Sequence, residues 1–180
     1  MIAIIAEKPS VGMDIARVVG ADTRNDGYCS GNGYMVTWAL GHLVSLATPD
    51  TYGYTKTAAE DLPMLPDPFR LVSRQMRTDR GMVTDIAASK QLKVIESVFN
   101  RCDSIIVATD AGREGELIFR WIYDFLGCTK PFRRLWISSL TDEAIRKGLE
   151  ELKDGSEYDS LYAAADSRAK ADWLGGMNAS

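Results

Sequence analysis

The sequence predicts an α/β fold in which a mostly parallel sheet is flanked by helices. Two short apolar runs, at residues 2–6 and 105–108, indicate buried strands because they are brief and rich in isoleucine and valine. Each run is followed by apolar residues at helical spacing. Alternation of strands and helices is typical of a parallel sheet covered by helices, and we expect this architecture for most of the chain.

The other elements can be placed from local signals along the chain. Pro9 can open the first helix and Gly20 can end it, and residues 21–33 are polar and glycine-rich, which indicates a loop. A strand at 34–40 ends near His42, the only histidine, which is expected to be structural more often than catalytic but is kept as a residue that could support the site or contact its ligand. Further elements are a turn-rich excursion at 48–68, an edge strand at 69–73, helices at 85–100 and from 113, a strand at 133–137, and helices from 141 and from 157.

The helix after the second apolar run carries two glutamates with different predicted positions. Glu114 lies four residues before a core residue, so we expect it to continue the core-facing stripe and to point toward Asp110. Glu116 lies four residues before Arg120 and is predicted to form a surface ion pair with it. In the simplest interpretation, Asp110 only caps the helix and Glu114 only favours its positive end.

Three acids are expected to converge at one edge of the sheet. Glu7 ends the first apolar strand and Asp110 ends the second. Since the carboxyl ends of parallel strands share one edge, Glu7, Asp110 and Glu114 can form one cluster there. Oxygen ligands without histidine or cysteine suit a hard cation, most naturally Mg²⁺. Lys8, beside this cluster, can hold a phosphate that the acids would otherwise repel.

Composition excludes several other classes of protein. The formal charge of −4 argues against a tight stand-alone DNA binder, which is usually basic. The three cysteines are widely spaced, so neither a zinc site nor a disulfide framework is indicated, and free thiols fit a reducing cytoplasm. No run reaches transmembrane length, and no phosphate-binding GxxxxGK[ST] loop occurs, so no membrane contact and no ATP site are predicted.

Six strings along the chain are together highly specific: EKPS, ALGH, LPMLPDPF, ATDAGREGELI, LWISSLT and SRAKADWLGGMN. In order and spacing they resemble the N-terminal part of a type IA DNA topoisomerase, closest to the topoisomerase III branch. The resemblance implies a Toprim domain at 1–155 and the start of the next domain at 156–180. It also implies Mg²⁺-dependent, ATP-independent breakage of one DNA strand through a 5′-phosphotyrosine, passage of another strand and rejoining. Single-stranded DNA would be the partner of the full-length enzyme, in the bacterial cytoplasm or nucleoid. The nucleophilic tyrosine of that family lies downstream, so this chain alone is expected to be inactive.

The resemblance also implies roles for the acids. Glu7 would act as proton donor and acceptor at the leaving 3′ oxygen, and Glu7, Asp110 and Glu114 would hold Mg²⁺. The family pattern is commonly Asp-x-Asp-x-Glu, but its middle acid is replaced here by Gly112. With one carboxylate fewer, we expect a weaker grip on the metal.

Basic residues are assigned to the DNA in the same way. Lys8 and Arg168 would stabilise charge on the reacting phosphate, and both would bind DNA. Arg134 would lie near the DNA backbone. Asp172 would belong to the DNA-facing helix, although an ion pair with Arg168, four residues away, is an equal alternative.

Two other functions remain open from the sequence. A Toprim nuclease or primase would use the same acids, but would leave the SRAKADWLGGMN string without a role. A non-enzymatic Toprim module that recruits recombination or repair partners would tolerate Gly112.

Overall fold

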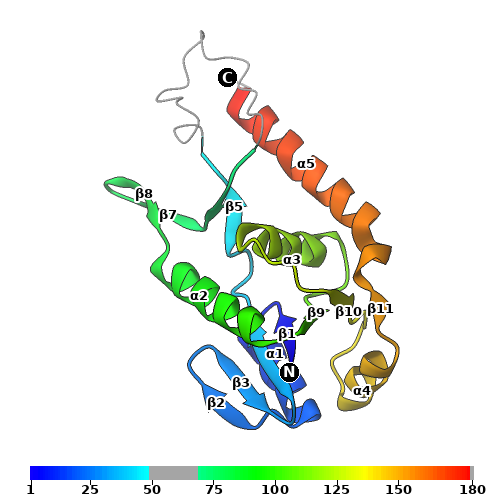
Figure 1. Ribbon diagram of the computed structural model, residues 1–180. Helices are drawn as coiled ribbons and strands as arrows, with labels where there is room; N and C mark the ends of the chain where they lie inside the picture. Colours follow the sequence, from blue (N-terminus) through cyan, green and yellow to red (C-terminus); the bar gives the residue numbers. More distant parts are fainter. Residues whose placement is uncertain (49–68, 179–180) are drawn as a thin grey trace.

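The computed structural model describes residues 1–48 and 69–178, and it shows a sheet covered by helices (Figure 1). The predicted excursion at 48–68 and most of the LPMLPDPF string fall outside the described residues. In this part of the chain, no helix combines the length and apolar character needed to cross a membrane.

The central sheet has the strand order β11-β10-β9-β1-β4-β3-β2, seven strands within the described residues. Its middle four strands run parallel, which confirms the predicted α/β architecture. They are β1 (Ile2–Ala6), β4 (Tyr34–Trp38), β9 (Ser104–Ala108) and β10 (Phe132–Arg134). The antiparallel edge strands are β2 (Thr23–Asn25), β3 (Tyr28–Gly31) and β11 (Lys153–Asp154).

The prediction of a loop at 21–33 is wrong. This segment forms the β2–β3 hairpin, which extends the sheet beyond β4. The three residues of β2 are all exposed, so the segment lacks the apolar pattern by which strands are recognised. Pairing of β3 with the buried strand β4 supplies the backbone hydrogen bonds, and that pairing is a long-range effect.

Helices cover both faces of the sheet. Ile4 and Ile5 point to opposite faces, and each belongs to a separate apolar cluster. One face is packed against α1 (Pro9–Val19) and α4 (Asp142–Glu150), and the other against α2 (Ile86–Arg101) and α3 (Arg113–Phe125). The predicted helix starts are close to those observed: Pro9 opens α1, and Asp85 caps α2 by accepting two backbone hydrogen bonds.

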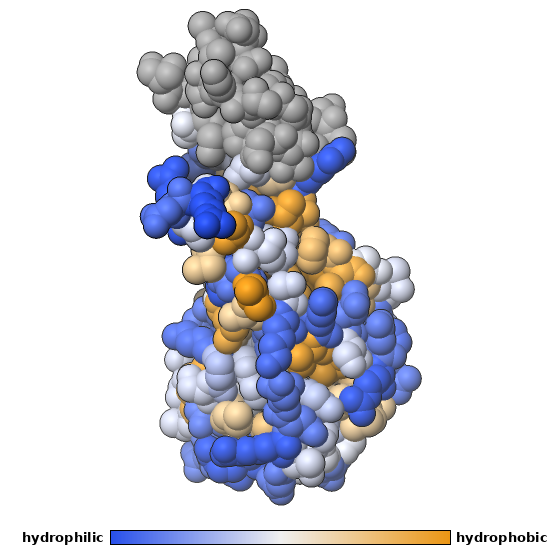
Figure 2. Space-filling model, turned by 90° about the vertical axis from the view of Figure 1, so that its left-hand side faces the viewer, coloured by the Kyte–Doolittle hydropathy of each residue, from blue (hydrophilic) through white to orange (hydrophobic). Residues whose placement is uncertain are grey.

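Two small two-stranded sheets lie outside the main sheet. β5 (Val44–Leu46) pairs with β6 (Leu71–Ser73), which corresponds to the predicted edge strand, and β7 (Gln75–Thr78) pairs with β8 (Gly81–Thr84). Figure 2 shows hydrophobic residues at the surface around the middle of the view. Exposed large apolar side chains occur on β7, on β8 and at the start of α2: Met76, Met82, Val83 and Ile86.

The last helix, α5 (Asp159–Asn178), runs along α3 and away from the sheet (Figure 1). It follows a 3₁₀ turn at Gly155–Tyr158, so the α-helix begins slightly later than predicted. The C-terminal part of α5 contacts the segments that flank β5 and β6. Trp173 Nε1 donates a hydrogen bond to the carbonyl of Ala47 (2.9 Å), and the ring of Phe69 packs edge-on against Trp173. The domain boundary at residue 155 stays a prediction.

Candidate functional site

The sheet brings Glu7 and Asp110 together. β1 and β9 are parallel neighbours in which Ala6 lies beside Ala108, so the residues that follow the two strands leave the sheet at one edge. The backbone N–H of Asp110 donates a hydrogen bond to Glu7 Oε1 (3.1 Å). Two carboxyl groups a hundred positions apart in sequence are therefore adjacent.

Glu114 does not join this pair, which corrects the prediction that it faces the core. Its side chain is 71% exposed and contacts Nε2 of His42 instead. Burial along α3 begins only at Gly115, so the first turn of the helix is exposed although Glu114 lies in line with the buried Ile118. Among the described residues, no three histidine, cysteine, aspartate or glutamate side chains are grouped as a metal site requires.

The contact between His42 and Glu114 forms one wall of a pocket of about 560 Å³. Arg168 and Asp172 of α5 line the same pocket, and the indole ring of Trp121 lies 6.0 Å from the imidazole ring. Within the described part of α5, the recorded ion pair joins Asp166 to Lys170 rather than Arg168 to Asp172. Sequence reasoning ranked His42 low, because its partner is 72 positions away.

Arg134 is buried, and its place near the DNA backbone stays a prediction. Its side chain is only 1% exposed. Nη2 donates to the carbonyl of Asp110 (2.7 Å) and Nη1 to the hydroxyl of Thr109 (2.8 Å). Arg134 therefore supports the turn that carries Asp110, from inside the protein.

Glu116 is also buried, which corrects its predicted surface position. The expected ion pair with Arg120 exists, at 3.1 Å, but the Glu116 side chain is 2% exposed and also lies 3.1 Å from Arg134 Nε. Burial raises the pKa of the Glu116 carboxyl and lowers that of the Arg134 guanidinium, and the attraction between the two opposes both shifts.

The carboxyl group of Glu7 is electrostatically unusual. Partial burial raises its pKa above the ordinary value of 4.5, and the charge of Asp110 and a side-chain hydrogen bond to Asp110 raise it further. The backbone hydrogen bond from Asp110 and the charge of the exposed Lys8 act in the opposite direction. Such a carboxyl is easier to protonate than an ordinary glutamate, which suits a group that gives and takes a proton.

Replacing Asp110 by Asn should lower the pKa of Glu7, because the like charge is removed while the backbone hydrogen bond is kept. A ¹³C NMR titration of the Glu7 side-chain carbon would measure the shift. The exposed Glu114→Gln serves as the control. Because the pKa of Glu7 is higher in the folded than in the unfolded state, its protonated carboxyl group stabilises the fold. This contribution is complete below the unfolded-state pKa and is lost as the pH rises through the folded-state pKa. Asp110→Asn should make this loss of stability with rising pH smaller. An unchanged or higher pKa of Glu7 in the variant would contradict the conclusion that the charge of Asp110 raises it.

Gly115 sets the close approach of α3 to the Asp110 turn. A Cβ at this position would lie 1.8 Å from the Asp110 carbonyl oxygen, which is a backbone atom and cannot swing away. Alanine normally stabilises a helix relative to glycine. Here we expect Gly115→Ala to destabilise the chain by about 1–3 kcal/mol in urea unfolding, as overpacking does. Gly175→Ala, with open space around its Cβ, is the control; equal stability of the two variants would contradict the prediction.

Glu7 and Asp110 have the donor chemistry of a hard-cation site. They offer carboxylate oxygens at one place, and a cation would relieve the repulsion that raises the Glu7 pKa. The residues present thus fit a divalent cation held by two carboxylates, with Glu114 turned away. Gly112 has a φ of 144°, a backbone conformation that side chains rarely adopt, so an aspartate there would require a different turn.

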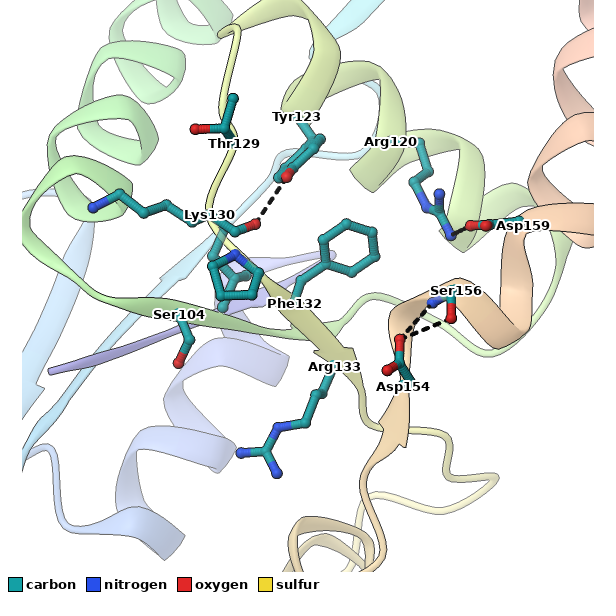
Figure 3. Close-up of a pocket in the computed structure, with 12 residues that line it drawn as sticks. Ser104, Arg120, Tyr123, Thr129, Lys130, Phe132, Arg133, Asp154, Ser156 and Asp159 are labelled. Carbon is teal, nitrogen blue, oxygen red and sulfur yellow. Dashed lines mark hydrogen bonds and ion pairs between the residues drawn. The ribbon is translucent and has the colours of Figure 1, made fainter.

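Another pocket, of about 680 Å³, lies away from this chemistry (Figure 3). Ser104 and Phe132, which begin β9 and β10, line it, so it is at the opposite edge of the sheet from Asp110. Arg120 and Asp159 in its wall are paired with each other (2.9 Å). Asp154, the other acid in its wall, accepts hydrogen bonds from Ser156. Both acids of this pocket therefore already have partners within the protein, and we take the Glu7 edge as the candidate site.

Comparison with known proteins gives a consistent family. A family model described as the Toprim domain matches residues 2–140. Curated relatives named "DNA topoisomerase 3" are 49% identical in Shouchella clausii (strain KSM-K16), 51% in Bacillus anthracis and 47% in Bacillus subtilis (strain 168), over 98% of this chain. The chain spans 23% of the length of these relatives.

A solved structure supports the fold. Full-length topoisomerase I from Thermotoga maritima aligns with 84% of this chain and 21% of its own, with a TM-score of 0.51. The sequence identity is 18%, so this likeness concerns the fold alone.

Proposed function

Since the chain belongs to the Toprim domain family, we propose that it is the Toprim part of a type IA DNA topoisomerase of the topoisomerase III kind. The observation that carries the proposal is the near 50% identity to proteins named DNA topoisomerase 3 along almost the whole chain. The full-length protein breaks one strand of DNA, passes another and reseals the break, in the bacterial cytoplasm and without ATP. The nucleophilic tyrosine belongs to the part of the protein outside these residues, so this chain alone does not relax DNA.

The proposed chemistry at the strand ends centres on Glu7. Its carboxyl group donates a proton to the leaving 3′ oxygen and takes it back on resealing, a role that the raised pKa supports. Lys8 is exposed beside it and can approach a phosphate. Arg168 is exposed on α5 and stabilises the negative charge that develops during transfer. The ground for these assignments is the resemblance of the EKPS and SRAKADWLGGMN strings to type IA topoisomerases.

Glu7 and Asp110 are the residues that would hold Mg²⁺, with Glu114 available only if it leaves His42. When bound, the ion supplies positive charge beside the phosphate and aligns the DNA ends. Single-stranded DNA is proposed to pass the pocket lined by His42, Arg168 and Asp172, where both charged side chains of α5 are accessible.

The full-length protein provides the decisive test. With Mg²⁺ and without ATP, it should convert a negatively supercoiled plasmid into a ladder of relaxed topoisomers, with a protein-linked 5′ end after denaturation. Cleavage without resealing would instead indicate a nuclease, and nucleotide polymerisation a primase. Absence of any strand breakage would favour the non-enzymatic module.

We expect this chain to bind Mg²⁺ weakly, because in the part of the chain that the structure describes only two carboxyl groups are together and Gly112 offers none. Isothermal titration calorimetry would measure the affinity, and Asp110→Asn should remove the binding heat. A submicromolar dissociation constant would contradict this expectation.

A further inference from the structure

A row of buried charged side chains links the Asp110 turn to the start of α5. Its members are Arg134, Glu116 and Arg120, all less than one-tenth exposed. Charged groups are rarely buried unless they are paired, and placing three in one core is costly. The hydrogen bonds of Arg134 and Arg120, at the two ends of the row, show which parts of the backbone it holds in place.

At one end of this row of buried charges, Arg134 fixes the turn that carries Asp110. Arg134 donates to the carbonyl of Asp110 and to the hydroxyl of Thr109. That hydroxyl in turn donates to the carbonyl of Gly115 (2.8 Å), which joins the end of β9 to the first turn of α3. One guanidinium therefore fixes both residues that follow β9, with the planar geometry that a lysine lacks.

Glu116 compensates the charge of this guanidinium. Its Oε1 lies 3.1 Å from Arg134 Nε, although the Nε–H is not aligned for a hydrogen bond to any group in the described residues. The contact is thus mainly electrostatic, inside a core where charges are weakly screened. The other oxygen, Oε2, accepts from Arg120, which leads outward to the carbonyl of Gly155 and to Asp159.

We propose that Glu116 is a positioning residue for Asp110 and acts through Arg134. Without the carboxylate, the buried cation loses the acid with which it forms an ion pair in the described residues. It then moves toward other acceptors, and the carbonyl of Asp110 loses its fixed partner. The Asp110 N–H then no longer meets Glu7 as it does now. The proposal rests on the proposed function only in taking Asp110 as a residue of the DNA-cleaving site. The effect of Glu116 on the position of Asp110 can be tested without DNA or metal.

The test is ¹H–¹⁵N NMR of this chain with Glu116→Gln, which keeps the shape and removes the charge. We expect the Asp110 amide proton to shift and its exchange with water to accelerate about five- to tenfold, the factor that one ordinary hydrogen bond supplies. Circular dichroism would verify the fold. Arg134→Lys keeps the charge but not the two-pronged contact and should give the same change, so it decides the question if Glu116→Gln does not fold.

Asp159→Asn is the matched control, because it removes the outer partner of Arg120 and leaves Arg134 untouched. It should leave the Asp110 amide as in the parent chain. If Asp159→Asn accelerates exchange as much as Glu116→Gln, the effect is general loosening and the proposal is overturned. It is equally overturned if the folded Glu116 and Arg134 variants both leave the amide unchanged.

Discussion

Replacing Glu7 by Gln in the full-length protein should slow DNA relaxation by about 10²- to 10⁴-fold, the loss typical of removing a general acid–base. The amide has nearly the shape of the carboxyl group and can still accept the hydrogen bond from Asp110, but it neither gives nor takes a proton. A plasmid relaxation time course measures the effect.

The matched control for this experiment is Glu150→Gln, an exposed glutamate of α4. It should relax DNA at the parent rate. If Glu7→Gln also relaxes DNA at the parent rate, the acid–base role is lost, and the module that only recruits partners becomes the better account.

Replacing Glu116 by Ala should lower the free energy of unfolding by about 3–5 kcal/mol, as expected when one member of a buried ion pair is removed. The loss is large because Arg134 is 1% exposed and would be left as a buried cation without its acid, while a cavity forms beside it. Urea unfolding followed by circular dichroism measures the difference.

The control is Glu114→Ala, two positions away but 71% exposed. Surface substitutions usually change stability by less than about 0.5 kcal/mol, and we expect that here. A loss below about 1 kcal/mol for Glu116→Ala would mean that the buried pair contributes little and that Arg134 finds another partner.

The same two glutamates show where sequence reasoning stops. The stripe of apolar residues on α3 predicted the helix, and the partner of Glu116 at i+4 was found from spacing alone. Which of the two acids faces inward was predicted wrongly. That choice depends on Arg134 of β10, which enters the core under α3 and requires a buried acid. No local pattern contains this information.

That Glu7 lies next to Asp110 could be predicted from the sequence, because a general rule of sheet geometry places them together. Both residues end buried strands, and the geometry of parallel strands places their carboxyl ends together whatever the intervening chain does. The contact of His42 with Glu114 had no such rule behind it, because the segment after β4 leaves the sheet before it reaches α3.

By itself, the sequence determined the α/β class, the central strands and helices, and the edge at which two acids meet, because these follow from hydrophobic period and strand direction. The tertiary structure alone decided that Glu116 and Arg134 are buried beneath Asp110, that Glu114 turns to His42, and that residues 23–31 extend the sheet. The physical reason is that burial of a charge and pairing of a polar strand depend on partners brought from distant parts of the chain.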